Sequence, residues 1–418
     1  MGQTAFVKSP TRPLVAGKLI RPFSLHLDLP LVVTVLVLIV IGLMMVYSAS
    51  WKSAAERDLP DTYYLGRQIV SVLIGIAAAL ALSVFDYHRF KNLLLPMVGG
   101  AIGLLLLVIV IGEDRNNATR TLLNGSIQPS EIAVLALIIY LSFWLYLKRE
   151  VLNIISFGLI PMTTILGIFA GLVWIQPDFS AAITIMAIGG ILFYLAGAEF
   201  RQLILVLVAA VLIGYFISTS TATGSSRIAN YLAGLTDPQK ASDHMKWVFT
   251  AITNGGLFGV GIGNSTTKFI GLPVPWTDSI YAVIIEETGI LGGSVILALY
   301  MFFLWRGMDI ARRASDQLGR LLAIGITFWI TFNALLNMGV IVNLFPFAGN
   351  ALPLVSYGGS SMFSTLAGIG ILMNIANSTS TKKIAQSEGR SFGAVIDLRR
   401  RDRRRRVSRP GGSGGTGE

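Results

Sequence analysis

The sequence predicts an all-α membrane protein with about ten transmembrane helices in a single bundle. Of its 418 residues, 53% are hydrophobic and only 13% are charged, about half the charged fraction of a typical soluble domain. Uncharged apolar runs of about 18 residues or more recur along the chain, and a helix of that length crosses the hydrocarbon core of a bilayer. The composition therefore excludes a chain of two or three soluble domains.

Ten apolar segments account for the predicted helices, and their limits lie where charged or polar residues interrupt the runs. Together they define a membrane domain over residues 29–378. It follows a basic N-terminal segment, 1–28, and precedes a basic tail, 379–418, which we expect to be disordered. The segments are 30–47, 69–85, 93–112, 131–147, 152–174, 180–197, 202–218, 280–304, 320–344 and 358–377.

Lysine and arginine set the predicted orientation. They collect in both terminal segments and in the short connections that the ten-helix topology places on the same side. By the positive-inside rule, both termini are then cytoplasmic. The tail "DLRRRDRRRRVSRP" carries most of the net charge of +11. Beside a membrane helix, such a tail is typical of contact with anionic lipid, not of nucleic-acid binding.

Residue types limit the possible cofactors. The chain has no cysteine, so disulfides and thiolate metal sites are excluded, and its three histidines lie far apart in the sequence. A metal ion would need carboxylate or phosphate oxygens, which suit Mg²⁺ or Mn²⁺. We expect no organic cofactor, because no dinucleotide or other cofactor motif is present.

The longest connection, 219–279, is the first place to look for function, because loops of this length in a compact bundle are usually functional. It lies on the outer side and contains the glycine-dense stretch "NGGLFGVGIGNSTTKF". Two interpretations stay open. The glycines permit close backbone packing, or their N–H groups line a groove for a phosphorylated or sugar ligand. Lys268 follows and could pair with an anion.

Acidic residues gather where this loop enters the eighth segment, in "PVPWTDSIYAVIIEE". Thr277 or Asp278 is well placed to cap the helix, since an acid there is favoured by the helix dipole. Glu286 and Glu287 lie within the apolar run, where ionisable groups are costly and usually functional. At 100° per residue, at most one of these glutamates can share a cavity with Asp278.

Three further helix starts on the outer side are polar, and each has an ordinary explanation in helix initiation or close packing. Because four such starts fall on one side, we expect them to converge on one cavity. Arg120, in the preceding outer loop, is either solvated or binds a phosphate in bidentate fashion. The polar residues of the three starts are Gln128, Ser130 and Glu131, then Asp178, then Ser356, Gly358, Gly359 and Ser360.

Five segments resemble the marker motifs of one family. They are "GSIQPSE", "QPDFSAA", "NGGLFGVGIGNSTTK", "TDSIYAVIIEETGILGG" and "LPLVSYGGSSM", and they run in the family's order across residues 30–377. The family is that of the SEDS proteins (shape, elongation, division and sporulation), which includes RodA, FtsW and SpoVE. "MMVYSAS" and the basic tail favour the FtsW-like branch.

The resemblance implies a ten-helix SEDS fold and a peptidoglycan glycosyltransferase that polymerises lipid II at the outer face of the cytoplasmic membrane. It implies that Asp278 is the essential aspartate. It also implies partners: lipid II and the lipid-linked glycan strand, a class B penicillin-binding transpeptidase, and other membrane proteins of division or elongation.

The expected chemistry needs a general base for the acceptor hydroxyl, which Asp278 can supply. It also needs a cation for the leaving pyrophosphate, and Arg120, Lys268 or a divalent ion could serve. Glu286 is expected to tune Asp278 or bind the metal, with Asp178 in a supporting role and the other polar helix-start residues, including Thr277, binding substrate.

Four positions depart from the family pattern, namely Thr121, Val134, Trp276 and Ser279, where an aromatic residue, a lysine, a histidine and a phenylalanine are usual. Two other functions stay open. One is a lipid II flippase or transporter, and the other is a non-catalytic scaffold. A flippase should expose polar groups on both faces, whereas the polar motifs here cluster on one side, which favours an enzyme.

Overall fold

The computed structural model describes residues 28–115, 118–121, 128–346 and 349–379. The N-terminal segment before residue 28 and the basic tail after residue 379 lie outside this range, so the predictions made for them stay predictions. Within the described part, eight helices are long and apolar enough to cross a membrane, and two shorter apolar helices accompany them. The prediction of an all-α multi-pass membrane protein with about ten spans is confirmed.

The helices follow the order of the predicted segments and several are longer, because polar residues such as Lys52 continue a helix past its apolar run. Short 3-10 and π turns, Tyr87–Leu93 and Ile155–Leu159, lead into α3 and α5. The bundle comprises α1 (Leu29–Ala55), α2 (Tyr63–Val84), α3 (Leu94–Ile111), α4 (Pro129–Lys148), α5 (Ile160–Ile175), α6 (Phe179–Leu195), α7 (Phe200–Ser220), α11 (Ile280–Arg313), α12 (Gln317–Ile341) and a C-terminal helix (Gly359–Thr379).

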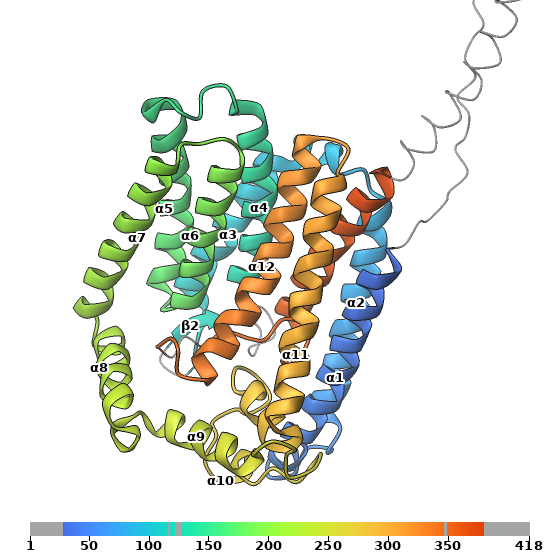
Figure 1. Ribbon diagram of the computed structural model, residues 1–418, viewed down its shortest axis with the longest axis vertical. Helices are drawn as coiled ribbons and strands as arrows, with labels where there is room; N and C mark the ends of the chain where they lie inside the picture. Colours follow the sequence, from blue (N-terminus) through green and yellow to red (C-terminus); the bar gives the residue numbers. More distant parts are fainter. Residues whose placement is uncertain (1–27, 116–117, 122–127, 347–348, 380–418) are drawn as a thin grey trace, which may run out of the picture.

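The spans lie side by side along the long axis (Figure 1), with α5, α6 and α7 on one side, α1 and α2 on the other, and α11 and α12 between them. The most buried spans are α4, α12 and the C-terminal helix, with 67–78% of their apolar windows buried, against 17–22% for α2 and for the span containing α3. The first three therefore form the centre of the bundle.

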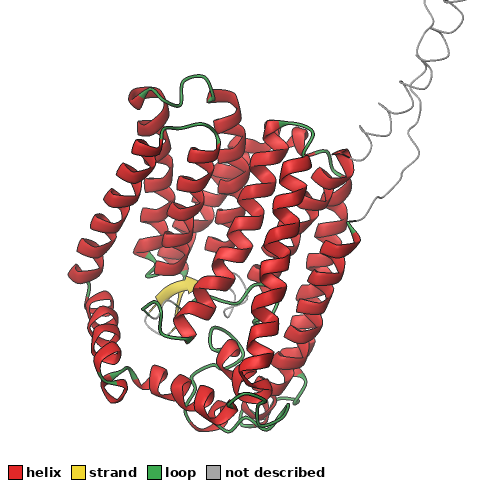
Figure 2. Ribbon diagram, in the orientation of Figure 1, coloured by secondary structure: helices red, strands yellow, loops and turns green. Residues whose placement is uncertain are grey.

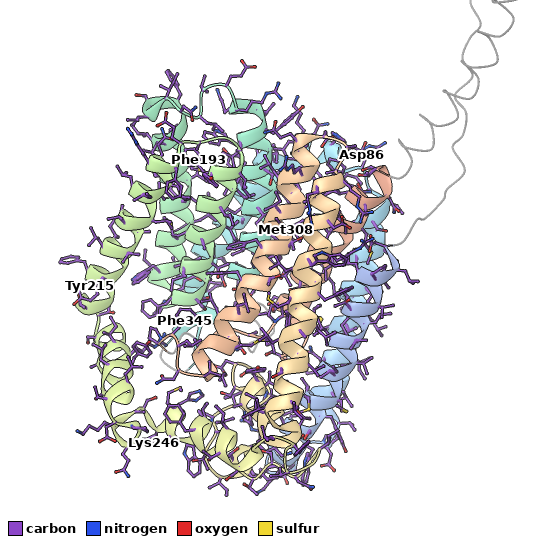
Figure 3. The ribbon with its side chains drawn as sticks, viewed as in Figure 1. Asp86, Phe193, Tyr215, Lys246, Met308 and Phe345 are labelled. Atoms are coloured by element: carbon purple, nitrogen blue, oxygen red, sulfur yellow. The ribbon has the colours of Figure 1, made fainter. Side chains whose placement is uncertain are left out.

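Large apolar side chains cover the outside of the bundle, as lipid contact requires. Tyr215 on α7 points outwards and is 63% exposed, whereas Phe193 on α6 points inwards and is buried (Figure 3). In water an apolar surface of this extent would favour aggregation. In a bilayer it is the ordinary surface of a membrane protein.

The long connection after α7 is mostly helical. It contains α8 (Ala222–Thr236), a 3-10 turn (Pro238–Lys240), α9 (Asp243–Gly255) and the short α10 (Thr267–Ile270). These elements close one end of the bundle, and the antiparallel hairpin of β1 (Glu113–Arg115) and β2 (Ala118–Thr121) lies towards the same end (Figure 2). We call this the Asp278 end, because α11 begins there.

Both described chain ends lie at the opposite end of the bundle. Asp28, at the start of α1, forms an ion pair of 2.7 Å with Arg306, near the end of α11. Asn374, near the end of the C-terminal helix, accepts a hydrogen bond from the backbone N–H of Tyr87 and donates to the carbonyl of Ser83. The termini and the Asp278 end are therefore on opposite sides, as the orientation prediction requires. Which of these sides is cytoplasmic rests on the charge pattern.

A break in α11 docks the glycine-rich loop. Gly289 has φ 75° and ψ 178°, which interrupts the helix. The loop fills the break, because Val260 N–H donates to the Glu286 carbonyl and Ile290 N–H donates to the Gly256 carbonyl. A Cβ on Gly259, whose φ is +82°, would lie 2.2 Å from the Glu287 carbonyl oxygen. Gly255 and Gly259 thus serve close backbone packing against α11, and the N–H of Val260 is used by α11 and does not line a ligand groove.

Candidate active site

Three of the four polar helix starts meet through direct hydrogen bonds. The backbone N–H of Gln128, before α4, donates to Ser360 Oγ of the C-terminal helix at 2.6 Å. The Gln128 side chain donates to Asp178 Oδ2 at 2.9 Å, and Ser130 Oγ donates to the same oxygen at 3.0 Å. Asp178 itself caps α6 by accepting from the N–H of Ala181. The starts of α4, α6 and the C-terminal helix are thus joined at one place.

The segment carrying Asp278 completes this meeting point. Ser356 Oγ donates to the carbonyl of Thr277 at 2.6 Å, and the N–H of Tyr357 donates to the carbonyl of Trp276 at 2.9 Å. All four polar starts therefore belong to one hydrogen-bonded group at the Asp278 end. The expected single cavity is not shared by all of them, because the small internal cavity next to them is lined by the starts of α4 and α6 and not by Asp278 or Ser356.

The Asp278 side chain does not cap a helix. α11 begins at Ile280 with Ser279 in the N-cap position, and no side-chain cap bond forms. The capping interpretation of Thr277 and Asp278 is wrong, because the Thr277 hydroxyl instead donates to Asp278 Oδ1 at 2.9 Å. Within the described residues this is the only hydrogen bond to that carboxylate. Asp278 is half-buried, so its carboxylate can receive a proton from a bound molecule.

A chain of asparagines fixes the backbone of Asp278. Asn337 of α12 donates to the carbonyl of Asp278 at 2.8 Å and to the carbonyl of Asn350 at 2.7 Å. Asn350 in turn donates to the carbonyl of Asn333 at 2.9 Å. Sequence reasoning missed these residues. The signal was present, because Asn333 and Asn337 lie four residues apart within an apolar segment and so share one helix face.

Gln68 of α2 holds the start of the C-terminal helix from the other side. It donates to the carbonyl of Ser356 at 3.1 Å and accepts from the N–H of Gly358 at 3.2 Å. Trp276, one of the departures from the family pattern, packs its ring 4.9 Å from that of Tyr64 on the same helix. α2 therefore contacts both the segment that carries Trp276 and the segment that carries Ser356 and Gly358.

Gln128, Ser130, Glu131 and Asp178 line a small internal cavity of about 20 Å³. A volume of that size holds about one water molecule and is far too small for a sugar. Val134 lies on its wall where the family usually has a lysine, so two carboxylates face the cavity without that cation. In this conformation the residues around the cavity hold the helix starts together. Substrate binding by these residues would require the cavity to open.

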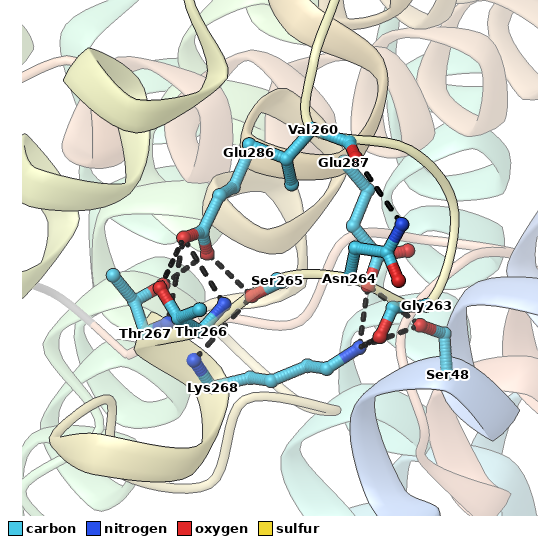
Figure 4. A network of polar contacts seen from close by, with 10 residues as sticks. All are labelled: Ser48, Val260, Gly263, Asn264, Ser265, Thr266, Thr267, Lys268, Glu286 and Glu287. Atoms are coloured by element: carbon cyan, nitrogen blue, oxygen red, sulfur yellow. Dashed lines mark hydrogen bonds and ion pairs between the residues drawn. The ribbon is translucent and has the colours of Figure 1, made fainter.

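Glu286 is held by residues of the glycine-rich loop and its neighbours (Figure 4). Its carboxylate accepts hydrogen bonds from the hydroxyls of Ser265 and Thr267 and from Thr266 Oγ1 at 3.3 Å. Asn254 Nδ2 also donates to this carboxylate, at 3.2 Å. None of the described hydrogen bonds joins it to Asp278. The expected roles of Glu286, tuning Asp278 or binding a metal, stay predictions.

Glu287 and Lys268 form a buried ion pair. Lys268 Nζ lies 2.5 Å from Glu287 Oε1, and both side chains are fully inaccessible. Ser48 of α1 donates to the same carboxylate oxygen at 2.6 Å, and Lys268 also donates to the carbonyl of Gly263 at 3.0 Å. We expected Lys268 to contact a phosphate. Its charge is instead neutralised inside the protein, where it joins α1, α10 and α11.

Arg120 lies on β2, and its side chain is outside what the structure describes, so its contact with a phosphate stays a prediction. Over the same described residues, no group of three or more His, Cys, Asp or Glu side chains is placed to hold a metal ion. A divalent ion at Asp278 would therefore need oxygens other than those of such a cluster, for example from a substrate pyrophosphate.

A half-buried carboxylate at the meeting point of helix starts, in a multi-pass helical bundle, defines a membrane protein with a polar site at one end. The model of the FtsW, RodA and SpoVE family, described as cell cycle proteins, matches residues 29–381. The chain belongs to this family, which confirms the resemblance seen in the sequence.

Curated relatives support the FtsW-like branch. The probable peptidoglycan glycosyltransferases FtsW of Geobacter metallireducens and Thioalkalivibrio sulfidiphilus are 34% and 38% identical to this chain. The alignments cover 84% and 85% of this chain and 94% and 90% of the relatives. Stage V sporulation protein E of Bacillus subtilis is 34% identical over 84% of this chain and 96% of its own length.

Solved structures share the fold. RodA of Thermus thermophilus matches with a TM-score of 0.63 and 26% identity, covering 85% of this chain and 98% of RodA. A chain of a peptidoglycan synthase complex, described for its coordination of polymerization and crosslinking, matches with a TM-score of 0.71 and 26% identity. That match covers 85% of this chain and 99% of the other.

Proposed function

We propose that this protein is a peptidoglycan glycosyltransferase that polymerises lipid II at the extracytoplasmic face of the cytoplasmic membrane, for cell division or cell shape. The proposal rests on the burial, hydrogen bonding and position of Asp278. Its carboxylate is half-buried and free of any capping role, and it lies where four polar helix starts join. The chain's relatives carry the name of this activity.

In the proposed reaction, Asp278 removes the proton of the acceptor sugar hydroxyl. The hydroxyl oxygen then attacks the anomeric carbon of the donor, and the bond from that carbon to the lipid pyrophosphate breaks with its electron pair on the pyrophosphate. General-base catalysis of this kind contributes about 10²- to 10⁴-fold. By family analogy the α-linked donor gives a β-1,4 bond.

The leaving pyrophosphate needs positive charge, and we propose that Arg120 supplies it through bidentate hydrogen bonds. A divalent cation, if one takes part, would be held by Asp278 and pyrophosphate oxygens and would stabilise the same charge. Gly358 and Gly359 precede and open the C-terminal helix, whose N-terminal dipole favours an anion. Thr277, Ser356 and Ser360 position the backbone around this place through the hydrogen bonds described above.

The proposed setting follows from the orientation and from the solved relatives. The basic termini favour the cytoplasmic side, so the Asp278 end faces outwards. A similar chain is part of a peptidoglycan synthase complex, which supports a class B penicillin-binding transpeptidase as the partner here. A flippase is the second candidate, but the polar network that surrounds Asp278 is concentrated at one end of the bundle.

The test is polymerisation of lipid II by the purified protein, with and without a transpeptidase partner. We expect glycan polymer from the parent and from Asp61→Asn, an exposed loop control, and a loss of about 10²-fold or more in Asp278→Asn. Unchanged polymer from Asp278→Asn would refute Asp278 as the base. Lipid translocation in vesicles without any polymer would favour the flippase.

Arg120 has its own test. Arg120→Ala should lower polymerisation much more than Lys240→Ala, a solvent-exposed control whose side chain pairs only with Asp237 in the described residues. Equal effects would remove the phosphate role from Arg120. Addition of a metal chelator, followed by restoration of Mg²⁺ or Mn²⁺, tests the divalent cation independently of both variants.

A further inference from the structure

His244 lies beside the residues that carry Asp278, although 34 positions separate the two in the sequence. It occupies the first turn of α9, which Ser242 caps by accepting from the N–H of Met245. α9 packs along α11, and this brings His244 Nε2 to 3.5 Å from the hydroxyl of Ser279. Ser279 is fully buried, so this contact places the imidazole against the residue that directly follows Asp278.

The electrostatic surroundings of His244 single out Asp278. Burial lowers the pKa of the His244 imidazole, and the negative charge of Asp278 acts in the opposite direction. At neutral pH the imidazole is therefore uncharged and can accept a proton. A carboxylate beside it stabilises the imidazolium that results.

The other acidic side chains on α9 and in the first half of α11 have partners of their own. On α9 itself, Asp243 forms an exposed ion pair with Lys246 at 3.1 Å. On α11, Glu286 is bound by hydroxyl groups, and Glu287 is paired with Lys268 of α10. Asp278 is thus the carboxylate on which His244 can act.

We propose that His244 acts through Asp278 as a positioning residue. In each cycle His244 receives the proton that Asp278 has taken up, and this restores the Asp278 carboxylate. This inference rests on the proposed function. The proton passes from the acceptor hydroxyl to Asp278, then to a ring nitrogen of His244, and from the imidazolium to water. No electrons are transferred, and the glycosidic bond forms in the first of these steps.

The relay gives a specific pH dependence. When the pH falls, His244 becomes protonated before turnover and can no longer take the proton from Asp278. The acidic limb of the rate profile should therefore contain two ionising groups in the parent and one group in His244→Gln.

The experiment measures kcat and KM for lipid II polymerisation between pH 5 and 8 in the full-length parent, His244→Gln, His244→Ala and Lys246→Gln. We expect kcat to fall about tenfold in both His244 variants with KM unchanged, and no change in Lys246→Gln, the matched surface control. Added imidazole should restore the rate of His244→Ala, because a free base can take the place of the missing ring.

Three outcomes would overturn the relay. They are an unchanged kcat in His244→Gln, an acidic limb of the same shape as in the parent, or a loss in His244→Ala that imidazole does not restore. If His244→Gln melts well below the parent, His244→Asn is measured in its place by the same criteria. Activity of Asp278→Asn would instead refute the base itself, so failure of the proposed function is recognised separately.

Discussion

One stretch of ten residues contains three acids, Asp278, Glu286 and Glu287, yet their burial and hydrogen bonding differ. The two glutamates are buried and bound by several donors, including a lysine. Asp278 is half-buried and, among the residues the structure describes, its carboxylate receives one hydrogen bond, from its neighbour Thr277. Stability depends on the glutamates because a buried charge must be compensated. An incompletely satisfied carboxylate is instead suited to exchange a proton with a substrate.

The largest effect should come from breaking the buried ion pair. Lys268→Met leaves Glu287 charged and unpaired in the interior, which costs on the order of 3–5 kcal/mol of unfolding free energy. Asp278→Asn should leave that free energy almost unchanged. Thermal unfolding in detergent measures both. The double variant Lys268→Met with Glu287→Met should recover most of the loss, and a double variant as unstable as the single one would contradict a role for the pair.

Removing the support of Asp278 should give an intermediate effect. Asn337→Leu deletes two hydrogen bonds, to the carbonyls of Asp278 and Asn350, and each unsatisfied acceptor costs about 1–3 kcal/mol. Because the backbone of Asp278 is then released, polymerisation should fall more than stability alone explains. Activity is therefore compared at a temperature where the variant is fully folded. Ser142→Ala, which removes a buried bond to the carbonyl of Ile138 within α4, is the control.

The smallest expected effect is on the pH dependence of stability. The folded-state pKa of His244 is lowered by burial, below its ordinary value of about 6.5 in the unfolded chain. Between these two values the unfolded state binds more protons, so stability falls as the pH drops below about 6.5, by at most ~1.4 kcal/mol per pH unit for one group. Above that value His244 contributes no pH dependence.

Melting temperatures at pH 8, 6.5 and 5.5 test this sign. His244→Gln should lose less stability than the parent on acidification. Asp278→Asn should lose more, because the charge that favours the imidazolium is gone. A parent whose stability rises as the pH falls from 6.5 would show that His244 is stabilised in its charged form.

Much of this organisation is predictable from the sequence. The apolar runs predict the ten spans. The polar helix starts all fall on one side of the membrane, which predicts that they lie close together, since short connections leave few other arrangements of the helices. Helical geometry also restricts how many of the glutamates can share a cavity with Asp278. These predictions depend on hydrophobic periodicity and on the lengths of the apolar runs, both of which can be read directly from the sequence.

The remainder depends on contacts between distant positions. Lys268 looked like a solvated or phosphate-binding loop residue, because nothing local reveals that Ser48, 220 positions away, and Glu287 enclose it. Capping by Asp278 was a reasonable local explanation, but the helix begins two residues later. His244 gave no local signal either, since its relation to Asp278 exists only once α9 packs against α11.

The docking of the glycine-rich loop in the break of α11 has a consequence for how this sequence can diverge. A Cβ on Gly259 would meet the backbone nitrogen of Gly289, and a Cβ on Gly289 would meet that of Gly259, each at 2.6 Å. Neither position can acquire a side chain unless the other segment moves. Among descendants of this protein the two positions should be kept or replaced together, and a lineage that straightens α11 should also lose the glycines of the loop.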